Sequence, residues 1–424
     1  MASTITRGDA DPPITPGGEQ LRRTLTLPWL VFYGVGVTVG AGIFALIGEL
    51  LGASGVHAPL AFLVAGTIAG LTGLSYMALV RTFPKASGEA VWVAEGLGPR
   101  AGRAAGLGII TAGTISSAVV ALAFGGYLGE LVDIPAELAA VMVIAALAAV
   151  ACRGVKESVL LAGVVTLLEV GTLVLVIVFG LPDLVTSSAV VDAVRPDGDV
   201  SGFATAVMSG AIVAFFAFIG FEDIVHMAEE TVDAERTAPR AIAWTLGISI
   251  TIYVVLALIA VSIDDPSAIE QSDAPMATLF ETLTGRGADI VATIAAIAMT
   301  NGILAQMMMA ARVVYGMTHD DLDDGEAVPI LGRTHPRWQT PVAATLLVAA
   351  TVTFLVLLVP LVELARTTSV VILTVFTLVN LSVVRLGGRD LYGLRRWRPV
   401  ALTACALAAP LAVWQAVDAV QSFT

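Results

Sequence analysis

Apolar segments long enough to cross a membrane recur along almost the whole chain. A helix needs about 20 mainly apolar residues to span the roughly 30 Å hydrocarbon core of a bilayer. We expect eleven such spans, at residues 28–52, 58–81, 104–129, 134–152, 158–181, 203–227, 241–263, 289–317, 341–359, 364–384 and 399–418. No connection between them is long enough for a separate soluble domain, so residues 22–424 are predicted to form a single transmembrane domain.

Composition supports this interpretation, because 57% of the residues are hydrophobic and only 13% are charged, whereas soluble domains are about 25% charged. The chain is therefore predicted to be an all-α polytopic membrane protein in contact with lipid. Residues 1–21 are instead polar and rich in Pro, Gly, Asp and Thr. They contain no apolar run before a small-residue cleavage site, which predicts a disordered cytoplasmic tail and no cleaved signal peptide.

Basic residues lie almost entirely on one side of the predicted membrane. Of the 22 Lys and Arg residues, all except Arg195, Arg286 and Arg366 fall in the tail or in connections on the same side as the tail. Cytoplasmic loops retain positive charge. We therefore expect a multi-pass protein of the cytoplasmic membrane with a cytoplasmic amino terminus. The net charge of −13 argues against nucleic acid as a partner.

The first span contains an unusual run of small residues, Gly34-Val35-Gly36-Val37-Thr38-Val39-Gly40-Ala41-Gly42. Glycine destabilises a helix interior by about 1 kcal/mol per residue. A broken helix inside a bilayer is tolerated where its free backbone groups line a cavity or meet a ligand. We therefore expect this helix to be interrupted, with amide groups placed to hold a carboxylate. The spacing of Gly36 and Gly40 also fits close helix packing.

The sixth span contains a second unusual stretch, Phe215-Phe216-Ala217-Phe218-Ile219-Gly220-Phe221-Glu222-Asp223. Two acids follow directly after an apolar run and a glycine, and charge at membrane depth normally faces a cavity or a partner. This makes Glu222 a candidate coupling group. The alternative is that the helix ends early and that both acids belong to an interfacial loop.

The two glycine-interrupted spans stand five spans apart. Two halves of five helices each must run in opposite directions through the membrane, so the topology predicts an inverted repeat. We assign residues 28–181 to the first repeat, 203–384 to the second, and 399–418 to an extra helix. Paired interrupted helices in such halves indicate the substrate site of a transporter, near the middle of the membrane.

Four stretches carry a family resemblance. They are Gly40-Ala41-Gly42-Ile43-Phe44; Phe216 to Glu222 with Arg236-Thr237-Ala238-Pro239-Arg240 beyond it; Asn301-Gly302 with Ala311-Arg312-Val313-Val314-Tyr315-Gly316; and Phe83-Pro84-Lys85-Ala86-Ser87-Gly88. In their order along the chain they resemble the amino acid–polyamine–organocation (APC) superfamily of secondary transporters, which share the inverted-repeat fold of the bacterial leucine transporter. The chain departs from that pattern at Ala78 and Ser87, where members often carry an acid and a glycine.

The resemblance implies an amino acid substrate, bound as a zwitterion and moved by alternating access of a bundle of spans one, two, six and seven. Backbone amides expected to hold its carboxylate are those of Gly40, Ala41 and Gly42. Backbone carbonyls expected to hold its amine are those of Phe216, Ala217 and Ile219. Side chains expected to line the pocket are Thr38, Val39 and Phe218.

Glu169 stands alone near the middle of the fifth span. Low dielectric disfavours its ionised form, so the carboxyl can cycle between protonated and ionised states. We expect it to be the proton-coupling group; the alternative is a static salt bridge or hydrogen bond to another helix. Some bacterial relatives carry near this position a lysine thought to replace sodium, so the coupling ion is a proton or sodium. Thr300 and Asn301 mark a further possible ion or polar site, or a packing hydrogen bond.

Enzymatic chemistry has no support in the sequence. There is no phosphate-binding loop and the four histidines are dispersed, so no cofactor and no metal site is predicted. The favoured function is proton-coupled amino acid symport. The alternatives are an amino acid or polyamine exchanger, which for polyamines needs several acids lining the pocket, and a substrate sensor that does not transport.

Overall fold

The computed structural model describes residues 24–83, 88–153, 159–196, 200–320, 329–389 and 391–422. Within these ranges the chain is helical and has no β-strand; one isolated bridge joins Leu25 and Thr231. The predicted tail, residues 1–21, lies outside the described ranges. The all-α class expected from composition is therefore confirmed.

A helix is present at each of the eleven predicted spans. These helices are α1 (Leu27–Ser54), α2 (Ala58–Thr82), α4 (Pro99–Gly129), α5 (Ala136–Arg153), α6 (Val159–Thr186), α8 (Val200–Phe216), α10 (Ala234–Ser262), α13 (Asp289–Asp320), α14 (Val342–Leu358), α15 (Leu361–Gly388) and α16 (Arg398–Ser422). By length and apolar composition, eight candidate membrane spans are found in the described residues, one of which runs through both α1 and α2. The helices α8 and α14 are apolar but shorter.

Short helices connect the long ones. They are α3 (Gly88–Leu97), α7 (Ala189–Val194), α9 (Asp223–His226), α11 (Ser267–Glu270) and α12 (Pro275–Thr284), with 3-10 turns η1 (Gly55–His57), η2 (Ala228–Glu230), η3 (Ile330–Gly332) and η4 (Leu391–Trp397).

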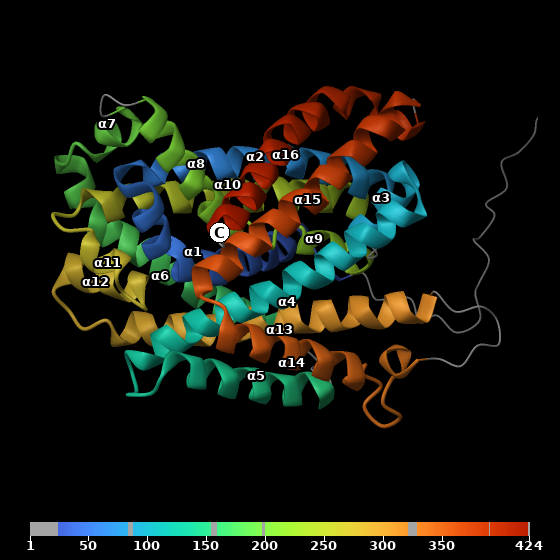
Figure 1. The fold of residues 1–424 in the computed structure, drawn as a ribbon, viewed down its shortest axis with the longest axis horizontal. Coiled ribbons are helices and arrows are strands. Elements are labelled where there is room, and N and C mark those ends of the chain that lie inside the picture. The colour runs from blue at the N-terminus through green and yellow to red at the C-terminus, as the bar shows by residue number, and fades with distance from the viewer. Residues whose placement is uncertain are drawn as a thin grey trace, which may run out of the picture.

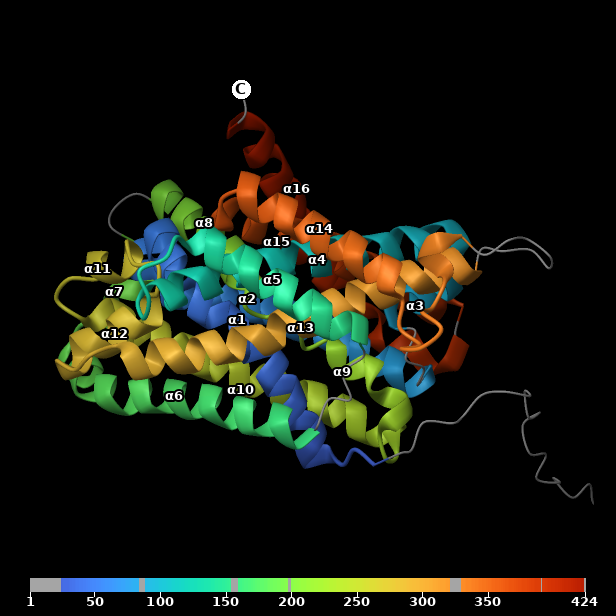
Figure 2. The ribbon, with the colours of Figure 1, turned by 90° about the horizontal axis from the view of Figure 1, so that it is seen from below.

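Helices from the two predicted repeats pack against each other. In Figure 1, α4 lies beside α13 and α5 lies beside α14, so segments far apart in the sequence run side by side. Figure 2 shows α6 and α10 on the opposite side of the bundle from α14 and α15. The central helix α1 contacts α6, α8, α10 and α13. The inverted relation between the two repeats stays a prediction.

The predicted interruption of the first span is wrong for this structure, because α1 continues unbroken from Leu27 to Ser54. Its glycines instead allow close contact with neighbouring helices, as the alternative interpretation proposed. A Cβ on Gly36 would lie 2.0 Å from Thr166 Oγ1 of α6, and one on Gly42 would lie 2.5 Å from the Ala217 Cα. Contact at these distances excludes any side chain.

The predicted interruption of the sixth span is confirmed. The helix α8 ends at Phe216, residues 217–222 form turns, and α9 begins at Asp223. We call residues 217–222 the break. Gly220 has a φ of +121° there, a conformation that residues with a side chain rarely adopt. Glu222 and Asp223 are only 5% and 7% exposed, so neither belongs to an exposed interfacial loop.

We expect Gly42→Ala to destabilise the protein, because the added methyl group would overlap the backbone at Ala217. Overpacking of this kind costs about 1–3 kcal/mol, so the thermal unfolding midpoint in detergent should fall by several degrees. The matched control is Gly171→Ala in α6, where a Cβ would have no neighbour within 4 Å. The control should unfold at or above the wild-type temperature, since alanine favours helix. Equal midpoints for the two variants would contradict this account of the glycine.

Candidate functional site

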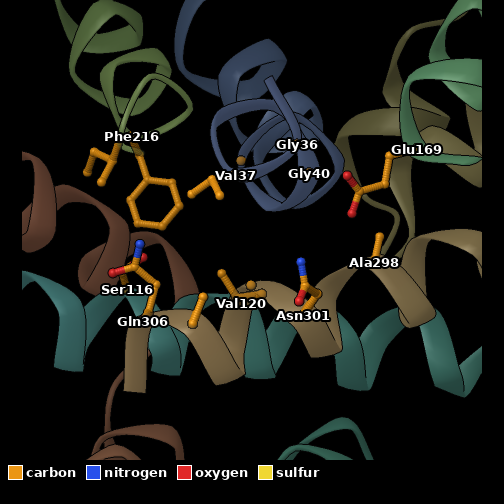
Figure 3. A pocket seen from close by; sticks show the side chains of 14 residues that line it. Gly36, Val37, Gly40, Ser116, Val120, Glu169, Phe216, Ala298, Asn301 and Gln306 are labelled. Atoms are coloured by element: carbon orange, nitrogen blue, oxygen red, sulfur yellow. The ribbon is translucent and has the colours of Figure 1, made fainter. Parts of the chain in front are cut away.

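A cavity with an empty volume of about 510 Å³ lies between α1, the break, α4, α6 and α13. Figure 3 shows residues of α1, α4, α6, α8 and α13 around one space. Its polar lining residues are Ser116, Glu169, Asn301 and Gln306. We call it the central cavity. Its walls come from both predicted repeats, at the place where the interrupted sixth span meets α1.

Glu169 is the charged residue of the central cavity. Its carboxyl points from α6 toward α1 (Figure 3) and the side chain is only 2% exposed. Gly40 provides the room, since a Cβ there would lie 2.9 Å from Glu169 Oε1. Among the described residues no donor or cation contacts this carboxyl, so the static salt bridge considered from the sequence has no partner there.

Six of the predicted site residues line the central cavity: Gly40, Gly42, Glu169, Phe216, Ile219 and Asn301. Six lie outside its lining: Thr38, Val39, Ala217, Phe218, Glu222 and Thr300. Ala41 belongs to the continuous part of α1. Because helix amides bond to carbonyls of the preceding turn, a role of the α1 amides in holding a carboxylate stays a prediction and requires α1 to open.

Three of these residues make other contacts. The Phe218 ring packs against Phe62 and Tyr253, with ring centroids 6.3 and 5.2 Å away. The Thr300 hydroxyl donates to the Ile297 carbonyl of its own helix, at 2.6 Å. The Ala217 carbonyl accepts a hydrogen bond from the Tyr253 hydroxyl at 2.8 Å.

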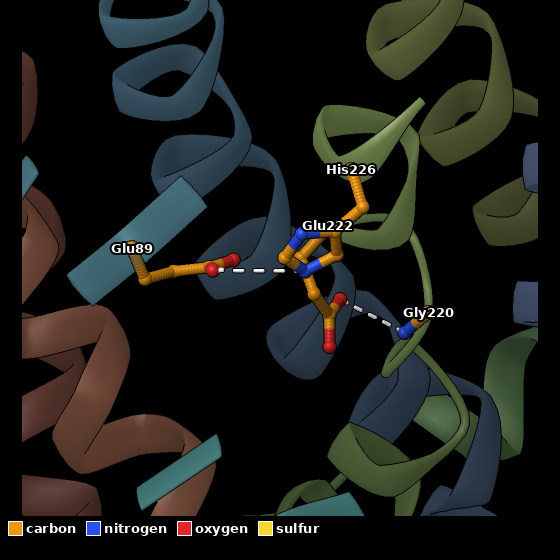
Figure 4. Close-up of polar contacts among 4 residues, drawn as sticks. All are labelled: Glu89, Gly220, Glu222 and His226. Atoms are coloured by element: carbon orange, nitrogen blue, oxygen red, sulfur yellow. Dashed lines mark hydrogen bonds and ion pairs between the residues drawn. The ribbon is translucent and has the colours of Figure 1, made fainter. Parts of the chain in front are cut away.

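Glu222 stabilises the break itself. Its Oε2 accepts a hydrogen bond from the Gly220 amide at 2.8 Å (Figure 4). The break removes that amide from any helix, and a buried amide without a partner is costly. One role of this acid, buried at membrane depth, is therefore to satisfy the backbone.

A second, smaller cavity adjoins the first. Its empty volume is about 260 Å³, and Ile219 and Gln306 belong to the walls of both. Glu222, Asp223 and His226 line it from the break and α9. We call it the acidic cavity. Glu89 of α3 approaches from outside this lining, with its Oε2 3.8 Å from His226 Nε2 (Figure 4).

Two buried side chains at these cavities make no hydrogen bond within the described residues, although the charge of His226 acts on one of them, Asp223. Asp223 and Gln306 are 7% and 8% exposed, and among the described residues neither side chain has a hydrogen-bond partner. No Lys or Arg lines either cavity in the part of the chain that the structure describes. The connected cavities therefore present acceptors to a cation.

Sequence reasoning missed Ser116, Gln306 and Tyr253. The first two are uncharged polar residues inside apolar spans, and that signal was available, although such residues usually make packing hydrogen bonds. Tyr253 gave no signal, because a tyrosine in an apolar span is ordinary until its partner is known.

Comparison with known proteins matches the family model "Amino acid permease" to residues 24–424. The chain is 31% identical to an uncharacterized transporter of Mycobacterium tuberculosis over 353 residues, which is 82% of this chain and 76% of the relative. It is 30% identical to the vacuolar cationic amino acid transporter 2 of Arabidopsis thaliana, covering 86% of this chain and 60% of that protein. It is 28% identical to the low-affinity putrescine importer PlaP of Escherichia coli, covering 88% and 83%.

We expect Glu222→Ala to lower the free energy of unfolding by about 1–3 kcal/mol, because the Gly220 amide would be buried without a partner. Glu222→Gln is the matched control, since its amide oxygen can accept the same hydrogen bond. The midpoint of thermal unfolding in detergent should be highest for the wild type, lower for Glu222→Gln and lowest for Glu222→Ala. If the two variants unfold at the same temperature, the hydrogen bond to the Gly220 amide does not stabilise the protein.

Proposed function

Since this chain belongs to the amino acid permease family, a part of the APC superfamily that its sequence motifs resemble, we propose that it is a secondary active transporter of amino acids. It moves its substrate across the cytoplasmic membrane by alternating access, with the amino terminus in the cytoplasm. The observation that supports this most is the central cavity, which the break, α1 and an unpaired buried carboxyl enclose together. A site at the break of a discontinuous helix is typical of secondary transporters.

The coupling ion in this proposal is a proton bound at Glu169. A carboxylate with no partner in a low-dielectric cavity is costly when ionised, so the group takes up a proton when the cavity excludes water. Protonation thus changes the charge of a group that faces α1 at Gly40, and this links ion binding to the helix that must move.

The substrate in this proposal is an α-amino acid. Ser116, Asn301 and Gln306 offer neutral donors and acceptors around the central cavity. The substrate carboxylate binds the backbone amides of Gly40, Ala41 and Gly42 once α1 opens. The carbonyls at the break hold the amine.

A second candidate is transport or exchange of a substrate with two positive ends, such as a basic amino acid or a diamine. Glu169 lies in the central cavity, while Glu222 and Asp223 line the acidic cavity, and Gln306 and Ile219 are common to both walls. Acids in two adjoining cavities suit a linear molecule with a cation at each end. The names of two relatives, a cationic amino acid transporter and a putrescine importer, are consistent with this candidate.

We expect proteoliposomes with an inward proton gradient to accumulate amino acids from a mixed radiolabelled panel. Glu169→Gln should abolish proton-driven accumulation, because an amide cannot release a proton, while substrate binding remains. The control is counterflow exchange with substrate on both sides, which needs no net proton movement and should survive.

Other outcomes of this experiment identify the alternatives. Accumulation driven by a sodium gradient alone would show that sodium is the coupling ion instead of the proton. Exchange without any gradient would indicate an exchanger, and binding with neither exchange nor accumulation would indicate a sensor. Full proton-driven accumulation by Glu169→Gln would remove this residue from the mechanism.

We expect Asp223→Asn to weaken competition by linear diamines and basic amino acids about tenfold, while competition by neutral amino acids is unchanged. The reason is the loss of a charge-assisted hydrogen bond, worth about 1.5–3 kcal/mol. Competition against radiolabelled uptake measures this, with the exposed Glu235→Gln as the control. A uniform loss of all substrates would count against the second candidate.

A further inference from the structure

The break leaves backbone groups without a helical partner, among them the Ala217 carbonyl and the Gly220 amide. The carbonyls of Ala214, Phe215 and Phe216 are taken by the tightened last turn, through the amides of residues 217–219 at 3.0–3.1 Å. The Gly220 amide is bound by Glu222 Oε2. Among the described residues, no backbone amide bonds to the next carbonyl in sequence, that of Ala217. Only the Tyr253 hydroxyl donates to it, from α10.

The same hydroxyl also contacts α1. Tyr253 Oη lies 2.8 Å from the Thr38 carbonyl and 2.8 Å from the Ala217 carbonyl. A phenol has one proton, so the two carbonyls share one donor. The ring is fully buried, and Phe62 and Phe218 pack on it with ring centroids at 5.2 Å each. The position of the hydroxyl is therefore fixed by α2, the break and α10.

The two carbonyls do not need this donor equally. Thr38 lies inside α1, where its carbonyl also has the helical amide of Gly42. The Ala217 carbonyl has only Tyr253, and a buried carbonyl without a partner is strongly disfavoured in a membrane protein. When α1 and the break separate, the Tyr253 hydroxyl therefore keeps its hydrogen bond to the Ala217 carbonyl and loses the one to Thr38.

We infer that Tyr253 is a positioning residue that holds the middle of α1 against the break, and that α1 opens at its glycines when this hydroxyl releases Thr38. The inference rests on the proposed alternating access. It differs from the movement of spans one, two, six and seven as one bundle, because the middle of α1 separates from span six and from Tyr253 of span seven.

The rest of α1 is held independently. At its start, the Leu25 amide donates to the Glu230 carbonyl and the Val232 amide donates to the Leu25 carbonyl. Beyond the glycines, the Tyr127 hydroxyl donates to the Phe44 carbonyl at 2.8 Å. Thr38 lies between these two contacts, at Leu25 and Phe44. Release of the contact at Thr38 therefore bends α1 in its middle and does not move the whole helix as a rigid body. Bending there frees the amides of Gly40, Ala41 and Gly42, which the proposed function assigns to the substrate carboxylate.

Hydrogen–deuterium exchange of the purified, substrate-free protein tests this inference. In the wild type, amides 36–42 of α1 should exchange faster than amides 217–221 of the break. Tyr253→Phe should accelerate exchange of residues 36–42 by about five- to tenfold, the effect of losing one hydrogen bond. The matched control Tyr127→Phe also loses a hydroxyl bonded to an α1 carbonyl, and it should accelerate exchange near Phe44 and at Met276, whose amide it binds, but not at the break.

A transport measurement separates positioning from general damage. Tyr253 does not line the central cavity. Because opening of α1 frees the amides assigned to the substrate carboxylate, Tyr253→Phe should lower KM several-fold for the amino acid that the uptake panel identifies, whereas general damage would lower the maximal rate alone. Unchanged exchange of residues 36–42 in Tyr253→Phe, or faster exchange at the break than in α1 of the wild type, would overturn the inference.

Two outcomes keep this test separate from the proposed function. If Tyr253→Phe does not fold, the wild-type comparison of α1 with the break decides alone. If the wild type takes up no amino acid, the proposed function fails, while the exchange data still decide whether Tyr253 holds α1.

Discussion

Every backbone amide and carbonyl inside a bilayer needs a partner, and this constraint shapes the centre of the protein. Interrupting the sixth span frees the Ala217 carbonyl and the Gly220 amide. Side chains bind both: the Tyr253 hydroxyl from α10, and the Glu222 carboxyl from two residues along the same turn. Both of these backbone groups are thus bonded by side chains, and Ile219 of the break lines the central cavity.

Small residues place that break against α1. Gly42 lies so close to Ala217 that a methyl group would overlap it, and Gly40 leaves room for the Glu169 carboxyl. Stabilising the break and bringing an acid to the cavity therefore depend on the same glycine-rich helix. A change in the shape of α1 would alter the contact with the break and the surroundings of Glu169 together, as the proposed coupled transport requires.

The acids in the middle of the protein have different surroundings. Among the described residues, Glu169 faces the central cavity without a partner, Glu222 binds the backbone, and Asp223 lines the acidic cavity together with His226. Desolvation makes an unpartnered ionised carboxylate costly, so Glu169 and Asp223 are the groups on which a proton or a substrate cation has the greatest effect. This difference among three acids is the basis for separating coupling, structural support and substrate preference.

The sequence by itself determined the all-α membrane class, the break in span six and the family, because apolar length, the low helix propensity of glycine and short motifs are local properties. It also identified Glu169, since an acid inside an apolar run is conspicuous. Only the tertiary structure decided that α1 is continuous, that Thr38 and Phe218 lie outside the cavity lining, and that Gln306 joins two cavities. The hydrogen bond of Tyr253 to Thr38 joins residues 215 positions apart. Such contacts follow from which helices pack together, and no local pattern in the chain encodes that choice.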